Sequence, residues 1–130
     1  MSLYLLDTTV LIDFAKQREA VMTRVLALLR AGNDLSTSPI SVAEYYAGAM
    51  LGEDPTMDRF IRQLPCWETS REIAMIAGDY RYRFQREFSR KLPTADTLIA
   101  ATARHYQATL LTNNPSDFPM NDITVERLGD

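Results

Sequence analysis

The chain has 130 residues, 46% of them hydrophobic, and carries a formal net charge of −3. This size and apolar content fit one globular domain. The acidic balance excludes a simple basic nucleic-acid-binding module, so any contact with nucleic acid must use a local basic patch or metal ions. The single cysteine, Cys66, excludes a disulfide within the chain and fits a reducing compartment such as the cytoplasm. No apolar run is long enough for a signal peptide or a membrane span.

The beginning of the chain predicts a strand followed by two helices. Leu3–Leu6 is a continuous apolar run that ends at Asp7, which is typical of a buried parallel strand with an acid at its carboxyl end. A helix that opens at Asp7 is followed by a second helix over about residues 19–31. Residues 34–37 predict a short second strand, although they contain few apolar residues.

Residues 38–48 repeat this change from a strand to a helix. Here Ser41 is the expected N-cap and Glu44 lies three positions later, which is the spacing of a capping box. Glu44 is therefore either a cap partner or a site residue. The two roles are compatible only if its carboxylate turns outward toward a cleft.

The middle of the chain predicts a helix from Asp54-Pro55, a short strand over residues 66–69, and a long helix over residues 70–90. Basic residues recur on one face of the long helix and just after it. Such a face is usually only solvated. In an otherwise acidic chain this cluster favours contact with a phosphate backbone. The candidate RNA-binding residues are Arg83, Arg86, Arg90 and Lys91.

The last third of the chain contains another helix start and another strand end. Thr94 is the expected N-cap of a helix with Asp96 in its first turn, where the helix dipole favours an ionised carboxyl group. A buried strand over residues 109–112 ends in a polar cluster, and residues 123–125 predict a closing strand. The alternation of strands and helices predicts an α/β sandwich with a mostly parallel central sheet.

Acidic and polar residues recur at the predicted strand ends or at the helix starts that follow them. In open parallel sheets the ligand site lies beyond the carboxyl ends of the strands. Several carboxylates gathered there cannot all stay ionised without a cation. Oxygen ligands without a His or Cys cluster indicate Mg²⁺ or Mn²⁺ and not zinc. Acids, metal and water suit phosphodiester hydrolysis, by one metal ion or two. The residues concerned are Asp7, Glu44, Asp96, Asn114 and Asp117.

Four segments of the chain resemble, in order and spacing, the four motifs of the PIN-domain ribonucleases, and specifically of the VapC-type toxins of type II toxin–antitoxin systems. These segments are residues 5–13, 41–48, 93–101 and 111–118. The resemblance implies that residues 1–130 form a single PIN domain, a three-layer α/β/α sandwich. It also implies a Mg²⁺- or Mn²⁺-dependent endoribonuclease, a homodimer, an RNA substrate such as tRNA or rRNA, and a cognate antitoxin that blocks the site.

The resemblance also implies roles for individual residues. Asp7 and Asp96 would bind the metal, and Glu44 would bind it or orient the attacking water. The fourth position falls on Asn114 or on Asp117, the latter a candidate catalytic acid. The candidate supporting residues are Thr9, Thr112 and Asn114. Thr9 stands where the family usually has Asn, and it keeps a hydroxyl group for hydrogen bonding.

Other functions are compatible with parts of this pattern. A catalytically idle PIN-like fold could serve as an RNA- or protein-binding module, but the chain retains three core acids that repel one another. A phosphoacceptor domain that uses Asp7 would need a second acid two residues later, and Thr9 stands there. A PIN nuclease of replication or repair is the enzymatic alternative.

Overall fold

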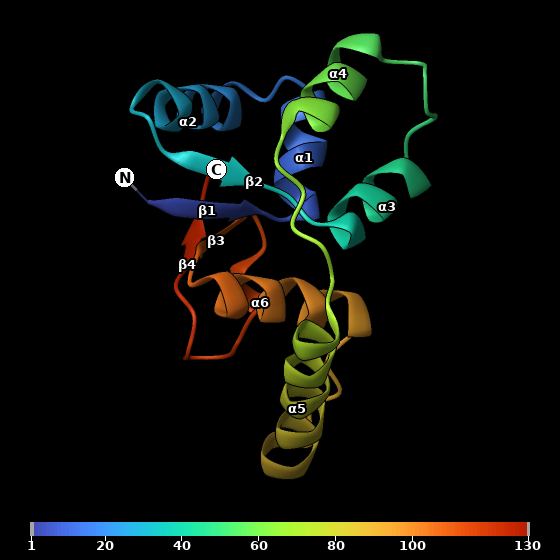
Figure 1. Ribbon diagram of the computed structural model, residues 1–130, viewed down its shortest axis with the longest axis vertical. Coiled ribbons are helices and arrows are strands. Elements are labelled where there is room, and N and C mark those ends of the chain that lie inside the picture. The colour runs from blue at the N-terminus through green and yellow to red at the C-terminus, as the bar shows by residue number, and fades with distance from the viewer. Residues whose placement is uncertain (1, 130) are drawn as a thin grey trace.

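The computed structural model describes residues 2–129, which fold into a central sheet with helices on both faces (Figure 1). The strands are β1 (Leu3–Leu6), β2 (Asp34–Ser36), β3 (Thr109–Thr112) and β4 (Val125–Arg127). The α-helices are α1 (Thr8–Ala15), α2 (Glu19–Arg30), α3 (Pro39–Ala47), α4 (Pro55–Gln63), α5 (Arg71–Phe88) and α6 (Thr94–Tyr106). A short 3₁₀ helix, η1 (Pro115–Asp117), follows β3.

The four strands are arranged in the order β2-β1-β3-β4, and each neighbouring pair is parallel. Leu5 of β1 is in register with Ser36 of β2 on one side and with Leu110 of β3 on the other. The strand order changes direction between β1 and β3, so the carboxyl ends of these two strands form the switch point where α/β sheets bind their ligands. The expected parallel sheet is confirmed.

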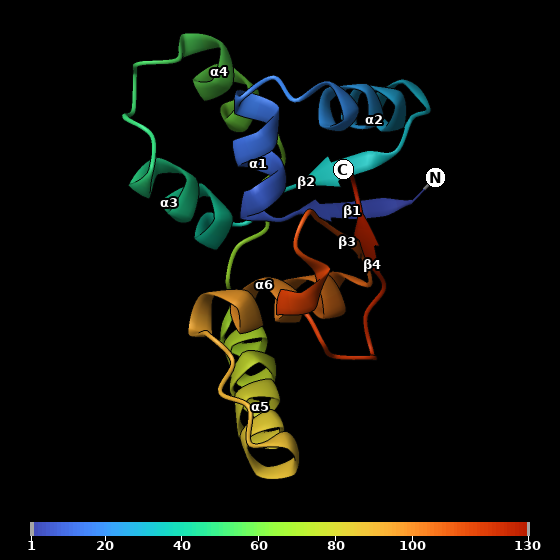
Figure 2. The same ribbon diagram turned by 180° about the vertical axis from the view of Figure 1, so that it is seen from behind.

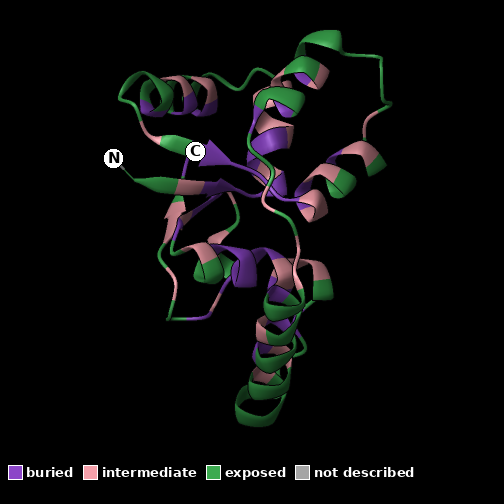
Figure 3. Ribbon diagram, in the orientation of Figure 1, coloured by how far each residue is buried: buried purple, intermediate pink, exposed green. Residues whose placement is uncertain are grey.

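Alternate residues of the central strands serve two separate cores. Leu5 and Leu110 pack with α5 and α6, whereas Leu6 and Leu111 pack with residues of α1 to α4. This alternation follows from the two-residue period of a strand. Figure 3 shows that buried residues concentrate on the sheet and on the helix faces that meet it, while the far end of α5 is exposed. The expected three-layer α/β/α sandwich is therefore confirmed.

Two helices begin one or more residues earlier than the sequence predicts. Ser38, not Ser41, caps α3, and its hydroxyl accepts a hydrogen bond from the amide of Ser41 at 3.2 Å. Pro39 at the first helical position explains this start, because its fixed φ suits a first turn. Thr94 is the first residue of α6 and not its cap, which is Pro93. Asp96 still lies in the first turn.

Three further boundaries differ from the prediction. The long helix α5 ends at Phe88 and not at Arg90, because Ser89 adopts a left-handed conformation with φ 50°. Residues 66–69 contribute one isolated bridge, between Thr37 and Cys66, in place of a strand. The closing strand β4 begins two residues later than expected, at Val125. No helix among residues 2–129 combines the length and the apolar character that a membrane crossing requires.

Candidate active site

The fold brings the beginnings of α1, α3 and α6 to one edge of the sheet, as the views from both sides show (Figures 1 and 2). Asp7 occupies this edge, because it follows β1 directly and is the N-cap residue of α1. An Asp at this position ordinarily caps the helix with its side chain. Here the carboxylate makes no such capping bond. It is therefore available for other partners.

Two threonine hydroxyl groups hold the Asp7 carboxylate. Thr112 donates to Oδ2 at 2.8 Å, and Thr9 donates to the same oxygen at 3.0 Å. The two hydroxyl oxygens lie 3.3 Å from each other. Each also accepts a backbone hydrogen bond at 3.0 Å, Thr9 from the amide of Asn113 and Thr112 from the amide of Asn114. Because each hydroxyl oxygen accepts a hydrogen bond from a backbone amide, its single proton is free to point toward Asp7.

The electrostatics of Asp7 reflect two opposing effects. The residue is only 4% exposed, and this burial raises the pKa of its carboxyl group above the usual 3.8. The hydrogen bonds from Thr112 and Thr9 stabilise the charged form and lower the pKa in part. Burial is the larger effect. The result is a carboxylate that is costly to keep charged unless a cation comes close.

Glu44 is held by a residue of α1. It lies exposed on α3, and its Oε1 accepts a hydrogen bond from the hydroxyl of Thr8 at 2.7 Å. The expected capping box with Ser41 is therefore wrong, and the glutamate is turned toward the residue that follows Asp7. Thr8 was missed at the sequence level, since its partner is 36 positions away. The adjacent residues Thr8 and Thr9 thus orient two different carboxylates.

Asp96 connects the remaining acids to this pair. The pKa of its carboxyl group is raised from 3.8 to about 6, first by burial and then by the negative charges of Asp117, Asp7 and Glu44. Charges influence one another in this way only when they are close. The charges of acids from three other parts of the sequence therefore act on Asp96.

Asn114 and Asp117, the two candidates for the fourth position, lie together. The Asn114 amide nitrogen donates to Asp117 Oδ2 at 2.7 Å, while its amide oxygen accepts from the Ser116 hydroxyl at 3.0 Å. Of these two residues, Asp117 is the one that carries a charge, and this charge raises the pKa of Asp96. Asn114 thus holds the acid, and the two residues form one unit at η1.

The four candidate RNA-binding residues are all exposed, but they lie in different surroundings. Arg83 pairs with Asp79 at 2.9 Å, and Arg86 donates to the Tyr82 hydroxyl at 3.1 Å. Arg90 lies beyond the end of α5 and donates to the carbonyl of Ser116 at 2.8 Å. This contact brings Arg90 to the segment that carries Asp117. Lys91 is next to it in the chain.

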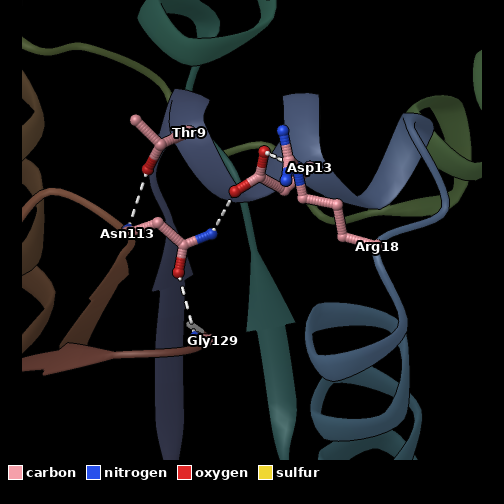
Figure 4. Close-up of polar contacts among 5 residues, drawn as sticks. All are labelled: Thr9, Asp13, Arg18, Asn113 and Gly129. Atoms are coloured by element: carbon pink, nitrogen blue, oxygen red, sulfur yellow. Dashed lines mark hydrogen bonds and ion pairs between the residues drawn. The ribbon is translucent and has the colours of Figure 1, made fainter.

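A second polar network, which the sequence did not predict, joins Asn113 to Thr9, Asp13 and Gly129 (Figure 4). The side chain of Asn113 donates to Asp13 at 2.6 Å and accepts from the amide of Gly129 at 3.0 Å. Asp13 in turn pairs with Arg18 at 2.9 Å. One signal was available: Asp13 lies four residues after Thr9 and so shares its helix face.

The donor set of the acidic cluster fits a hard divalent cation. Its acids offer carboxylate oxygens, the ligands that Mg²⁺ and Mn²⁺ prefer. Within the described residues none of the acids Asp7, Glu44, Asp96 and Asp117 forms an ion pair with Arg or Lys. Between residues 2 and 129, no three Asp, Glu, His or Cys side chains are gathered closely enough to hold one ion as they stand. The cluster is thus an uncompensated negative site and not a finished coordination cage.

Comparisons with known proteins identify the family of the chain. Residues 4–119 match the model of the PIN domain family. Ribonuclease VapC19 of Mycobacterium tuberculosis is 31% identical over 116 residues, which cover 89% of this chain and 92% of the relative.

Solved structures share the fold. A VapBC2 structure from Rickettsia felis, bound to a DNA fragment from the promoter, matches with a TM-score of 0.80 at 22% identity, over 96% of this chain and 98% of the other. A toxin–antitoxin complex from Klebsiella pneumoniae matches with a TM-score of 0.73 at 24% identity, over 93% and 95% of the two chains. The chain therefore belongs to the PIN-domain family and, within it, to the VapC-type ribonuclease toxins.

Proposed function

We propose that this protein is a metal-dependent endoribonuclease toxin whose reaction centre is the cluster of Asp7, Glu44, Asp96 and Asp117. One observation carries the proposal: the pKa of Asp96 is raised to about 6 by burial and by the three other acids. Carboxylates that repel one another at the switch point of the sheet lower the stability of the fold. Strongly perturbed acids in such a place are typical of functional sites.

Asp7 and Asp96 would bind Mg²⁺ or Mn²⁺, with Glu44 as a further ligand or as the residue that orients water. When bound, such an ion lowers the pKa of a water molecule and stabilises negative charge on the scissile phosphate. The hydroxyls of Thr9 and Thr112 both donate to Oδ2 of Asp7 and so fix the direction of its carboxylate. Thr8 fixes Glu44 through Oε1, which leaves Oε2 for the water.

The reaction would be hydrolysis of an RNA phosphodiester. The oxygen of water forms a bond to phosphorus, the bond to one ribose oxygen breaks, and that oxygen leaves with a proton. Glu44, one of whose oxygens is held by Thr8, would accept the proton that the water loses. Asp117 and Asn114 would complete the rim of the site. Arg90, which contacts Ser116 at this rim, would neutralise a phosphate of the substrate.

The partners follow from the family. We expect an RNA substrate such as tRNA or rRNA, a cognate antitoxin that blocks the acidic site, and a homodimer in the cytoplasm. The relatives support the antitoxin, because VapBC2 and the Klebsiella protein were solved as toxin–antitoxin assemblies. Arg83, Arg86 and Lys91 would extend the RNA contact beyond the reaction centre.

The test is cleavage of total cellular RNA by the purified protein beside Asp96→Asn, with Mg²⁺ or Mn²⁺ and again with EDTA. We expect discrete fragments from the wild type alone, and none in EDTA. Asp96→Asn should keep its circular dichroism spectrum while losing Mn²⁺ binding in calorimetry. An equal faint background from both proteins, together with no growth arrest when the wild type is expressed, would instead favour an idle binding module.

A further inference from the structure

The turn after β3 connects the acidic site to the end of the chain. Asn113 lies between Thr112 and Asn114, the two residues assigned to the site on either side of it. Its own side chain points toward Asp13 of α1 and toward Gly129 (Figure 4). The nitrogen and the oxygen of this amide each have a partner: Asp13 Oδ2 at 2.6 Å and the amide of Gly129 at 3.0 Å.

The partners of Asn113 are themselves fixed. Asp13 is held by Arg18 through its other oxygen at 2.9 Å. Gly129 follows the buried Leu128, and a Cβ atom at Gly129 would lie only 2.9 Å from Cγ2 of Val21. Asn113 is therefore clamped between α1, through Asp13, and the segment after β4, through Gly129.

This clamp acts on the site through the backbone. The amide of Asn113 donates to the hydroxyl of Thr9, and the next amide, of Asn114, donates to the hydroxyl of Thr112. A displaced turn would lengthen or misalign these hydrogen bonds and so weaken them. Each hydroxyl could then rotate its proton away from Asp7.

We propose that Asn113 is a positioning residue: by clamping the turn between Asp13 and Gly129, it aims the hydroxyl protons of Thr9 and Thr112 at the Asp7 carboxylate. The inference rests on the proposed function, since it assigns Asn113 to the same metal-binding site. It differs from a purely structural role, in which the clamp would stabilise the fold and leave the affinity for metal unchanged.

The structure offers a set of variants that separates the two roles. Asn113→Ala removes the clamp, and Asn113→Asp puts a second carboxylate against Asp13. The double variant Asn113→Asp with Asp13→Asn exchanges donor and acceptor, so every hydrogen bond of the network can form again. Asn33→Ala is the matched control, because Asn33 also joins a turn to a chain end, through Leu28 and Ser2, far from the acids.

Mn²⁺ affinity by calorimetry is the primary measurement, made where each variant is folded by circular dichroism. We expect Asn113→Ala and Asn113→Asp to bind Mn²⁺ about tenfold or more weakly, as for other changes behind metal ligands. The double variant should recover the affinity, and Asn33→Ala should lose stability alone. Amide signals of residues 113 and 114 in NMR spectra should shift in Asn113→Ala and return in the double variant.

Two results would overturn the inference. Unchanged Mn²⁺ affinity in Asn113→Ala would make Asn113 a structural residue only, and so would a double variant that binds as weakly as Asn113→Asp. Failure of the proposed function is distinguishable, because in that case the wild type itself would bind no Mn²⁺. Where the wild type cleaves RNA, Asn113→Ala should lower kcat more than it changes KM.

Discussion

At the scale of single residues, hydroxyl groups decide how the site presents its acids. Asp7 is buried and would resist ionisation, but Thr9 and Thr112 give its Oδ2 two donors. Hydrogen bonds to a charged group contribute about 1.5–3 kcal/mol each. The hydroxyls of Thr9 and Thr112 therefore offset part of the cost of charging Asp7, while burial still keeps its pKa raised.

Thr112→Val tests the role of the Thr112 hydroxyl, because valine has nearly the same volume as threonine but no hydroxyl group. The variant deprives Asp7 of the 2.8 Å donor and the amide of Asn114 of its acceptor, so we expect a loss of about 1–3 kcal/mol in the free energy of unfolding. Mn²⁺ affinity should fall with it. Urea denaturation and calorimetry measure the two effects. Thr102→Val is the control, because this buried threonine bonds only the carbonyl of Leu98 in its own helix; equal Mn²⁺ affinity in the two variants would contradict the assignment.

The raised pKa of Asp96 predicts how stability depends on pH without a divalent ion. Below pH 3.8 the carboxyl group is neutral in both the folded and unfolded chains. Between 3.8 and about 6 the unfolded chain has released the proton while the folded chain retains it, so stability falls as pH rises through this window. The half-buried position and solvent screening limit the loss to about 1–2 kcal/mol.

Denaturation at a series of pH values in EDTA measures this slope. Asp96→Asn should flatten most of it and should be more stable than the wild type near neutral pH. Asp7, whose pKa is also raised, accounts for the slope that is left. Asp34→Asn, at the exposed start of β2, should keep the wild-type slope. A wild type that gains stability through this window would show that the acids are not in mutual repulsion.

At the scale of elements, α6 can carry Asp96 to the edge of the sheet because the side chains on its buried face are small. Ala100, Ala101 and Ala103 are fully buried and let the helix lie close to the sheet and to α5. Ala101→Leu should overpack this contact and cost about 1–3 kcal/mol of unfolding free energy. Ala74→Leu, on the exposed face of α5, should change it by less than about 0.5 kcal/mol. Denaturation midpoints that shift equally would refute this account of α6.

The next prediction concerns α5, whose basic residues Arg83 and Arg86 do not contact the acids of the site. Arg83→Glu with Arg86→Glu should weaken RNA binding more at low salt than at high salt. The slope of log affinity against log salt should decrease by about 0.7 for each phosphate of a single strand that the variant no longer neutralises. Arg30→Glu at the end of α2 also reverses the charge of an exposed arginine, and it should leave the slope unaltered. An unaltered slope in the α5 variant would mean that its arginines are only solvated.

At the scale of the whole molecule, the order of elements and the place of Asp7 at the carboxyl end of a parallel strand followed from the sequence. Apolar runs such as Leu3–Leu6 and Thr109–Thr112 mark buried strands, and parallel strands put their carboxyl ends at one edge. The capping of α3 did not follow, because Ser41 and Glu44 satisfy the spacing of a capping box while Pro39 moves the true cap to Ser38.

The contacts that orient the acids could not be predicted, because no local spacing encodes them. Thr8 and Glu44 are 36 positions apart, and Asn113 meets Asp13 across 100 positions. These pairs exist only once the sheet has formed. Propensity and periodicity describe neighbours along a helix or strand, so they identify the acids and miss the residues that hold them.

The strand order also decides when this site can come into being. β1 is made first, yet it lies in the middle of the sheet, and its partner β3 carries the hydroxyl that meets Asp7 from 105 positions further along the chain. A polypeptide still emerging from the ribosome has Asp7 and Glu44 long before it has Asp96, Thr112 or Asp117. Chains that stop before β3 lack Thr112 and Asp117, so they cannot assemble the cluster that the folded toxin presents.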